Sequence, residues 1–372
     1  MSVGSAVDVS LGFSAPAGTR PLVGLVAQVH VPATSANLGP GFDALGLALA
    51  YGDGLDVEAV ELPDDAGAGP DRDRVSVTGE GEGCLPADGS HLAARTIREA
   101  WAAWGVDARG VGLRLRATNR IKHGRGQGSS AAAIVAALSA AAALLPEPAR
   151  PGRDDVFELA ARLEGHPDNV APAVYGGLTV SWTGEAGAEA PAPWGEGEEA
   201  GRRFRTAVLR PHAAVVPLVA IPDAVLSTAA ARGLLPREVP HAVAAANSGR
   251  AALLVHALTG DPSLLGVATQ DRLHQEFRAP AMPASAALVA ALRARGLAAT
   301  VSGAGPTVLV LASADEGGDL PRAREALAEL TGDGAFGTPT RLGAEGEAVA
   351  WRVLEPGIDV RGATVKAHRT VS

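Results

Sequence analysis

Short stretches in which apolar and polar residues alternate predict β-strands, because successive side chains of a strand point to opposite faces. Residues 53–62 and 112–118 show this alternation most clearly. Residues 91–104 instead place Ile and Trp at helical spacing, and they predict a helix with one apolar side. Strands and helices follow one another without a regular βαβ order, so the pattern predicts an α+β fold.

The remaining elements are expected from shorter signals. Further strands are predicted at 23–31, 75–77, 178–182, 215–220, 298–301 and 308–311. Further helices are predicted at 129–145, 154–164, 239–258 and 285–296. The third of these four helices is the longest, and the helix at 154–164 offers Asp154 or Asp155 as a plausible N-cap.

The length of 372 residues exceeds one ordinary domain core, so two packed domains are expected. Residues 1–22 are rich in Gly, Ser, Ala and Pro and predict a disordered leader. Residues 23–200 form the predicted N-terminal domain and residues 201–372 the C-terminal one. Residues 184–201, rich in Gly, Glu, Ala and Pro, are either a flexible insert or the seam between the domains. The core residues are expected to include Trp101, Trp104 and Trp182.

Composition excludes several classes of protein. Net charge is -9 and aromatic residues make up 3%, so nucleic acid is not expected as a partner. The single cysteine, Cys84, excludes a disulfide framework and makes a thiolate metal site improbable. No secretory signal opens the chain, and the apolar run 131–145 is too short to cross a membrane. These observations predict a soluble, cytoplasmic protein without a membrane partner.

The strongest chemical signal is a glycine-rich turn that leads into an Ala-rich helix. Three alternating glycines, Gly124, Gly126 and Gly128, precede Ser129 and Ser130. Glycine lets the backbone approach a ligand closely, and a helix start presents unpaired N–H groups to an anion. The simpler alternative is a tight turn with Ser129 as N-cap. The run ends without the Gly-Lys-Ser/Thr of a Walker A loop, and it matches a dinucleotide fingerprint poorly.

Two other polar groups stand in turns. Asn37 and Asp43 lie six residues apart between apolar runs, which turn chemistry alone would explain. His166, Asp168 and Asn169 lie where prolines prevent a regular helix. A lone histidine is more often structural than functional, so the residues by themselves leave both interpretations open.

Three motifs together give a specific resemblance. Residues 126–132 (GQGSSAA) resemble the phosphate loop of the GHMP kinases, and residues 32–46 and 302–307 resemble two further motifs of that family in the same order. Residues 37–46 and 164–173 resemble the homoserine kinases within it most closely. The resemblance covers nearly the whole chain after residue 22. It implies a two-domain α+β fold, with an N-terminal ribosomal protein S5 domain 2-like part and a C-terminal ferredoxin-like α/β sandwich.

The resemblance also implies what the site binds. It implies transfer of the γ-phosphate of ATP to L-homoserine, with Mg²⁺ as cofactor, in a homodimer. The residues expected around ATP are His123, Gly124, Arg125, Gly126, Gln127, Gly128, Ser129, Ser130 and Ala131. Adenine is expected to contact residues between 55 and 100. The family usually has Pro at position 122 and Leu at position 127; here Lys122 is expected to attract phosphate and the side chain of Gln127 to face solvent.

Roles for the acceptor follow from the same resemblance. Asp43 is expected to face the ammonium of the amino acid, and Asn37 its hydroxyl. The expected carboxylate-binding residues are Arg232 and Arg278, because a guanidinium binds carboxylate with two hydrogen bonds. The remaining expected substrate-binding residues are His166 and Asp168.

The catalytic group is expected to comprise Asn37, Asn169 and Ser130. Asn169 stands where mevalonate-type relatives carry an Asp, and an amide cannot take a proton, so catalysis is expected to depend on positioning and charge stabilisation. Glu158 lies eleven residues before Asn169, and the same count in the relatives reaches a Mg²⁺ ligand. The resemblance therefore implies Glu158 as a Mg²⁺ ligand with Ser130, and Glu164 is the competing carboxylate.

Three alternatives remain open. One is a GHMP kinase for another alcohol such as mevalonate, against which Asn169 and the two arginines argue. The second is a non-catalytic relative that only binds a ligand. The third, a nicotinamide-dependent enzyme, has only the glycine run in its favour.

Overall fold

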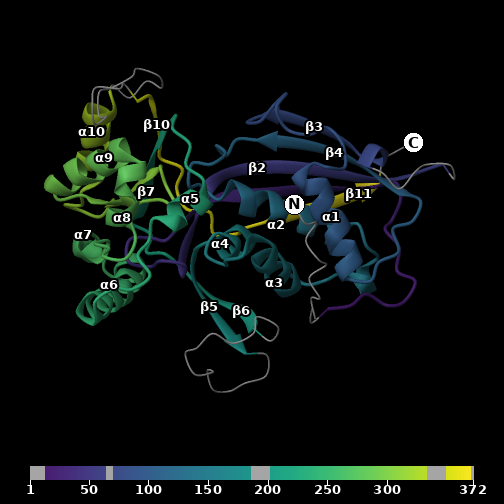
Figure 1. Ribbon diagram of the computed structural model, residues 1–372, viewed down its shortest axis with the longest axis horizontal. Helices are drawn as coiled ribbons and strands as arrows, with labels where there is room; N and C mark the ends of the chain where they lie inside the picture. The colour runs from purple at the N-terminus through teal and green to yellow at the C-terminus, as the bar shows by residue number, and fades with distance from the viewer. Residues whose placement is uncertain (1–12, 64–69, 186–201, 333–348, 370–372) are drawn as a thin grey trace.

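The computed structural model describes residues 13–63, 70–185, 202–332 and 349–369. Its elements form two β-sheets that lie end to end, each with helices packed on it (Figure 1). The larger sheet has seven strands in the order β11-β1-β2-β4-β3, with β5 pairing to β2 and β6 pairing to β5. Its strands are β1 Leu25–Ala36, β2 Leu45–Glu61, β3 Arg74–Gly79, β4 Val111–Asn119, β5 Leu178–Glu185, β6 Arg202–Leu209 and β11 Thr364–Arg369.

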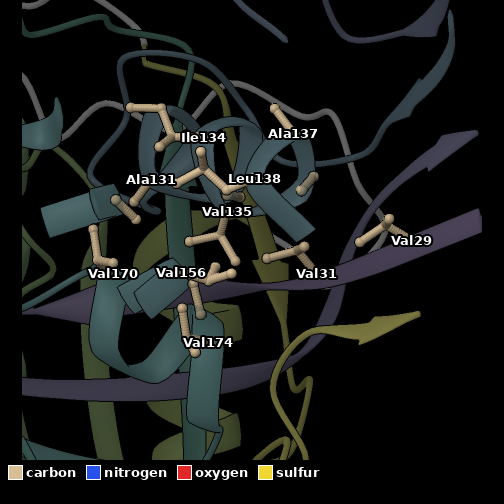
Figure 2. Packing of buried hydrophobic residues seen from close by; sticks show 14 of the residues in the cluster. Val29, Val31, Ala131, Ile134, Val135, Ala137, Leu138, Val156, Val170 and Val174 are labelled. Carbon is tan, nitrogen blue, oxygen red and sulfur yellow. The ribbon is translucent and has the colours of Figure 1, made fainter. Parts of the chain in front are cut away.

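Four helices cover one face of the larger sheet. They are α1 Leu92–Ala103, α2 Ser129–Ala143, α3 Arg153–Glu164 and α4 Val170–Tyr175. The central helix α2 is buried along almost its whole length, and it packs on α1, α3, α4 and β1. Its many alanines let neighbouring backbones approach closely. Ile134, Val135 and Leu138 supply the larger side chains between helix and sheet (Figure 2).

The smaller sheet is antiparallel, with strand order β10-β7-β9-β8. Its strands are β7 Val215–Pro222, β8 Ala298–Val301, β9 Val308–Ser313 and β10 Trp351–Leu354. The helices that lie between β7 and β10 in sequence are α5 Thr228–Gly233, α6 His241–Thr259, α7 Leu265–Ala268, α8 Gln275–Arg278, α9 Pro283–Ala294 and α10 Leu320–Thr331. A second core forms where α9 and α10 pack on β7 and β9, around Leu218, Leu288 and Leu327. Helix α5 lies at the junction of the two halves (Figure 1).

The two sheets divide the chain differently from the predicted domains. β6 (202–209) and β11 (364–369) belong to the larger sheet, although both lie in the expected C-terminal domain of residues 201–372. β11 pairs antiparallel with β1, so that Leu25 lies opposite Arg369. The chain therefore enters the smaller sheet after β6 and returns to the larger one after β10. Of the expected insert or seam at 184–201, residues 184–185 end β5 and residues 186–201 lie outside the described part of the chain.

The predicted disordered leader is contradicted for its second half. Phe13 packs edge-on against Trp104, with ring centroids 6.2 Å apart, and the Leu22 N–H donates to the Leu144 carbonyl at 2.8 Å. Residues 13–22 are held because they cover the ends of α1 and α2. Residues 1–12 lie outside the described part of the chain.

Three smaller expectations have different outcomes. Trp101 and Trp104 are buried as predicted, whereas Trp182 is 50% exposed on the outer face of β5, so its predicted core position is wrong. Helix α3 begins after Gly152 as N-cap, and the predicted alternative Asp155 is the third helical residue, whose carboxylate accepts from the Gly152 N–H at 2.9 Å. Within the described residues, every helix is too short or too polar to cross a bilayer.

Candidate functional site

The glycine-rich turn, here called the phosphate loop (residues 123–131), connects β4 to α2. Its three glycines have positive φ angles of 64°, 71° and 67° for Gly124, Gly126 and Gly128. Other residues rarely adopt this conformation, which explains their regular spacing. Gly128 is the N-cap of α2, so the predicted alternative of Ser129 as N-cap is wrong.

The carbonyl groups of the loop are turned away from its concave side. Their hydrogen-bond donors come from three other segments: Leu226 N–H to Gly124 O (3.0 Å), Thr307 N–H to Arg125 O (3.3 Å), Ser302 Oγ to Gly126 O (2.6 Å) and Thr34 N–H to Gln127 O (3.1 Å). In the described part of the chain, no group accepts from the N–H groups of residues 124–129. A run of unpaired amides at a helix N-terminus attracts an anion, so this loop can hold a phosphate group.

Neighbouring atoms leave no room for a side chain at Gly126 and Gly128. A Cβ at Gly126 would lie 2.2 Å from the Ser302 carbonyl oxygen, and a Cβ at Gly128 would lie 2.0 Å from Thr34 Oγ1. The loop is thus clamped between β1 and the residues 302–307 that connect β8 and β9. The shape of this anion cradle is set by backbone contacts from both halves of the molecule.

An apolar cavity of about 360 Å³ adjoins the loop on the side of the larger sheet. Its apolar lining includes Leu55, Leu85, Pro86, Leu92, Ala133 and Ala136. Asn119, His91 and the two loop serines add polar groups. A flat apolar group joined to a phosphate chain fits such a pocket. Much of the lining lies between residues 53 and 95, which matches the region where adenine was expected.

A serine and a carboxylate meet at the start of α2. Ser130 Oγ donates to Glu164 Oε2 at 2.8 Å, and burial raises the pKa of Glu164 although the bond to Ser130 opposes that shift. The predicted ligand Glu158 lies elsewhere: its carboxylate pairs with Arg162 at 2.7 Å and accepts from the Phe204 N–H at 2.9 Å. In this structure the carboxylate of Glu158 is therefore engaged by Arg162 and Phe204 and makes no contact with Ser130. Glu164, the competing candidate, holds that position.

A second cavity, the acceptor cavity, of about 140 Å³, opens between the loop and the smaller sheet. It brings together most of the predicted site residues: Asn37, Asp43, Ser130, Glu164, His166, Asp168, Asn169, Arg232 and Arg278. They come from five separate segments of the chain. Glu158 is not among its lining residues.

The turn after β1 places two of these side chains. Asn37 and Asp43 both have positive φ, at 55° and 54°, which Asn and Asp tolerate better than other residues with a Cβ. The Asn37 Oδ1 accepts from the Asp43 N–H at 2.8 Å and closes the turn. The turn chemistry that the sequence left as an alternative is therefore present, and it directs the Asp43 carboxylate into the acceptor cavity.

Asp43 already has a cationic partner. Arg232, near the end of α5, donates to both carboxylate oxygens of Asp43, at 2.8 and 2.9 Å. Their side chains are 46% and 35% exposed, respectively. The guanidinium of Arg232 also lies 5.6 Å from the centroid of the Phe42 ring. Pairing with Asp43 raises the pKa of Arg232 although burial opposes it.

Arg278 is held much more deeply. It is 1% exposed, lies 5.2 Å from the Phe42 ring centroid, and donates to the Gly303 carbonyl at 3.3 Å and to Ala231 at 3.4 Å. Burial lowers the pKa of Arg278. In the described residues its hydrogen-bond acceptors are all neutral and its bonds are long, so no carboxylate is bonded directly to its charge. A ligand carboxylate in the acceptor cavity would supply the missing charge.

His274 packs beside Arg278 and is one of its hydrogen-bond partners. Its buried ring stacks on Phe42, with centroids 5.3 Å apart, and its Nε2 lies 2.8 Å from the Gly39 carbonyl. Burial lowers the pKa of His274, so Nε2 donates to Gly39 and Nδ1 can accept from Arg278 at 3.3 Å. No pattern in the sequence indicated a role for His274 or Phe42. Their proximity in sequence to Arg278 and Asp43 was the only available signal.

The segment before α4 completes the cavity. His166 Nδ1 lies 2.6 Å from Asp168 Oδ1, which also accepts from the Asn169 N–H at 3.0 Å. Burial opposes protonation of His166, but the hydrogen bond and charge of Asp168 outweigh it and raise the pKa of His166. Thr34 Oγ1 donates to Asn169 Oδ1 at 2.8 Å, which fixes the orientation of that amide beside Gly128.

Three side chains in or next to the phosphate loop are oriented differently from the predictions. Gln127 is 1% exposed, so the prediction that its side chain faces solvent is wrong. Lys122 pairs with Glu80 at 2.8 Å, which leaves its predicted attraction for phosphate opposed by a carboxylate. Arg125 directs its guanidinium to the carbonyls of Pro222 and Asp223, at 3.0 and 2.9 Å, and only its backbone belongs to the cradle.

Two family models match the chain. Residues 91–177 match the GHMP kinases N terminal domain, and residues 251–332 match the GHMP kinases C terminal. The first range spans the phosphate loop and the segment 164–169. The second includes Arg278 and the turn 302–307.

Several curated proteins are similar over most of the chain. A homoserine kinase from Streptomyces coelicolor is 46% identical over 93% of this chain and 96% of its own length. A homoserine kinase from Clavibacter michiganensis is 45% identical over 91% of this chain and 93% of its own length. These matches extend well beyond the motifs.

Solved structures share the fold. The crystal structure of homoserine kinase from Cytophaga hutchinsonii has a TM-score of 0.70 at 24% identity, and it covers 92% of this chain and 97% of that one. A mevalonate kinase from L. major, solved with R-mevalonate, has a TM-score of 0.54 at 15% identity, covering 93% of this chain and 98% of that one. At these identities the likeness establishes the fold.

Proposed function

The chain belongs to the GHMP kinase family, and we propose that it carries out the reaction named by its homoserine kinase relatives. In that reaction the γ-phosphoryl group of ATP passes to the side-chain hydroxyl of L-homoserine, and the products are ADP and O-phospho-L-homoserine. Curated relatives at 45–47% identity over most of the chain support the acceptor as well as the chemistry. The observation that carries the proposal is the acceptor cavity, where Asp43, Arg232 and Arg278 surround a space that borders the phosphate loop.

The phosphate loop is proposed to bind the triphosphate through its unpaired N–H groups. The adjoining apolar cavity then takes the adenosine moiety. Phosphoryl transfer passes through a loose transition state with little covalent participation by the protein. Amides that are already oriented toward the charge lower its energy without reorganisation.

Magnesium is proposed to bind beside Ser130 and Glu164. These residues fit the ion, because Mg²⁺ prefers hard oxygen ligands and takes its remaining ligands from water and phosphate. The pKa of Glu164 is raised mainly by burial, with Asp168 adding to that shift, so this acidic pocket would be relieved by a divalent cation. When bound, the ion would neutralise charge on the transferred phosphate.

The acceptor is proposed to enter by exchanging ion pairs. The α-ammonium of homoserine takes Arg232's place at Asp43, and the α-carboxylate bonds to Arg232 and Arg278. A pair as exposed as Asp43–Arg232 contributes only about 0–1 kcal/mol, so opening it costs little. Both charges of the amino acid are then needed, since a ligand with one charge would leave one partner unpaired.

Catalysis is proposed to rest on positioning. Asn169 cannot accept a proton, and its oxygen is already bonded to Thr34. Asp168 is occupied by His166 and by the Asn169 N–H. The hydroxyl therefore transfers its proton late, to a phosphate oxygen, while Asn37 and Asn169 orient the reacting groups.

The test is ADP release from Mg·ATP in a coupled assay, with L-homoserine, L-homoserine amide, N-acetyl-L-homoserine, L-serine and mevalonate compared. Turnover with L-homoserine far above all others is expected. Equal turnover with either homoserine derivative would contradict the ion-pair exchange. Turnover with mevalonate alone would replace the acceptor, and saturable ATP binding without any turnover would indicate a ligand-binding relative. The homodimer and the cytoplasmic location stay predictions.

A further inference from the structure

Arg125 lies within the phosphate loop but directs its side chain out of it. Its Nε and Nη2 donate to the carbonyls of Pro222 and Asp223, and Nη1 curls back to His123 O at 3.0 Å. The side chain is 14% exposed, and Glu80 lies 3.6 Å from it. All three nitrogens of the Arg125 guanidinium therefore donate to backbone carbonyls of the protein itself.

The two carbonyls that Arg125 binds begin the segment that carries Arg232. Pro222 is the last residue of β7, and residues 222–233, here called the acceptor segment, run from there through α5. The same segment is bonded to the loop a second time, because the Leu226 N–H donates to the Gly124 carbonyl at 3.0 Å. Gly124 and Arg125 therefore hold both the base and the middle of the acceptor segment.

The far end of the acceptor segment lies beside the acceptor cavity. Arg232 reaches Asp43, and the Ala231 carbonyl accepts from Arg278. A displacement of the phosphate loop is thus transmitted through two short links to the group that receives the α-carboxylate. Elsewhere the acceptor segment is loosely covered, since Val225 is 66% exposed. Besides the links to the loop, the base of the segment has one further anchor, because the Asp223 N–H donates to the Ala350 carbonyl at 3.1 Å.

We propose that Arg125 is a positioning residue that couples nucleotide binding in the phosphate loop to the placement of Arg232. This inference rests on the proposed function. When the triphosphate orders the loop, Arg125 and the Gly124 carbonyl fix the acceptor segment, and the acceptor binds more tightly. By reciprocity the acceptor tightens nucleotide binding by the same factor.

The test compares Arg125→Ala and Arg125→Lys with the native protein and with Arg324→Ala. Arg324 is a matched control, because it is an exposed arginine of the smaller half that pairs with Glu355 at 2.7 Å and lines neither cavity beside the loop. The affinity for a non-hydrolysable ATP analogue with Mg²⁺ is measured by calorimetry with and without saturating L-homoserine. Thermal unfolding of each variant verifies the fold.

The native protein and Arg324→Ala are expected to bind the analogue about tenfold more tightly with homoserine present. In Arg125→Ala this factor falls toward one, while affinity for the analogue alone changes less than about threefold, because no guanidinium contact to phosphate is lost. Arg125→Lys keeps the charge but makes fewer bonds, so an intermediate factor is expected. KM for homoserine should rise in the alanine variant more than KM for ATP.

A loss of about tenfold or more in analogue affinity alone, with the factor unchanged, would make Arg125 a phosphate contact and overturn the proposal. A native protein without any coupling would overturn it as well. Hydrogen exchange separates this failure from failure of the proposed function, because it needs no acceptor. The analogue alone should slow exchange of residues 222–233 in the native protein and not in Arg125→Ala; unchanged exchange in the native protein would contradict the coupling.

Discussion

The two sides of the site are built by different means. On the nucleotide side, the phosphate loop is shaped by backbone: left-handed glycines, carbonyls bonded outward and amides left for the ligand. On the acceptor side, charged side chains meet one another, as in Asp43–Arg232 and His166–Asp168. A backbone site binds any phosphate chain and tolerates no added Cβ. A side-chain site selects the acceptor, and its partners must be exchanged before that acceptor can bind.

The largest effect is expected from adding one carbon on the backbone side. Gly126→Ala places a Cβ 2.2 Å from the Ser302 carbonyl oxygen, so the loop must move and its amides lose their common target. We expect kcat/KM for Mg·ATP to fall roughly 10³-fold or more. The matched control is Gly83→Ala, because Gly83 has the same φ of 71° but open space around it. If both variants lost the same activity, backbone strain and not the clash would be responsible.

A smaller effect, confined to the acceptor, is expected on the side-chain side. Arg232→Ala removes the exposed partner of the α-carboxylate, and kcat/KM for homoserine should fall about 10²-fold, roughly 2–4 kcal/mol. KM for ATP should change little. Arg295→Ala, which breaks the surface pair with Glu329, is the control. An effect of Arg232→Ala no larger than that of the control would remove Arg232 from the acceptor site.

Two carboxylates of α3, Glu158 and Glu164, are the alternative magnesium ligands at the boundary between the nucleotide side and the acceptor side. Glu164→Gln should raise the magnesium concentration needed for half-maximal rate on the order of tenfold, because a charged oxygen ligand is lost. Glu158→Gln should leave it unchanged, since that side chain binds Arg162 and the Phe204 N–H, and an amide oxygen can still accept from the latter. The reverse outcome would restore the ligand that the sequence indicated.

The smallest effect concerns stability on the acceptor side. Burial holds the pKa of His274 below its ordinary value of about 6.5, so the unfolded chain binds a proton that the folded protein does not. The stabilisation from neutral His274 is therefore complete above pH 6.5 and decreases as pH falls toward its folded pKa. We expect the urea midpoint to decline less steeply below pH 6.5 in His274→Gln than in the native protein. Parallel declines would show that other groups cause the acid sensitivity.

The backbone side was largely predictable from sequence, because glycine spacing and the start of a helix are local properties. On the acceptor side, the sequence predicted which residues take part but not how their side chains are oriented. Glu158 and Glu164 lie six residues apart on α3, which turns them about 120° away from each other, and sequence alone does not say which faces Ser130. Arg125 and Gln127 were expected to be ligands or to face solvent, yet their directions depend on residues 222–223 and on the packing under the loop.

The fold shows the same division between local and distant information. Strands β1, β2 and β4 and helices α1, α2 and α3 were expected close to where they lie, since each has its own periodicity. β6 and β11 were missed as members of the larger sheet, because short strands acquire their partners through pairing with distant residues. Trp182 was placed in the core by its size, but its position on β5 turns it outward.

The pairing of β11 with β1 also sets an order of events during synthesis. Val29 lies opposite Val365, so the strand that covers this edge of the larger sheet leaves the ribosome long after the rest of that sheet. Until then β1 presents an unpaired edge, of the kind that invites association with other nascent chains. A stop codon before residue 364 would leave this edge of the larger sheet open while keeping every residue of the phosphate loop and the acceptor cavity.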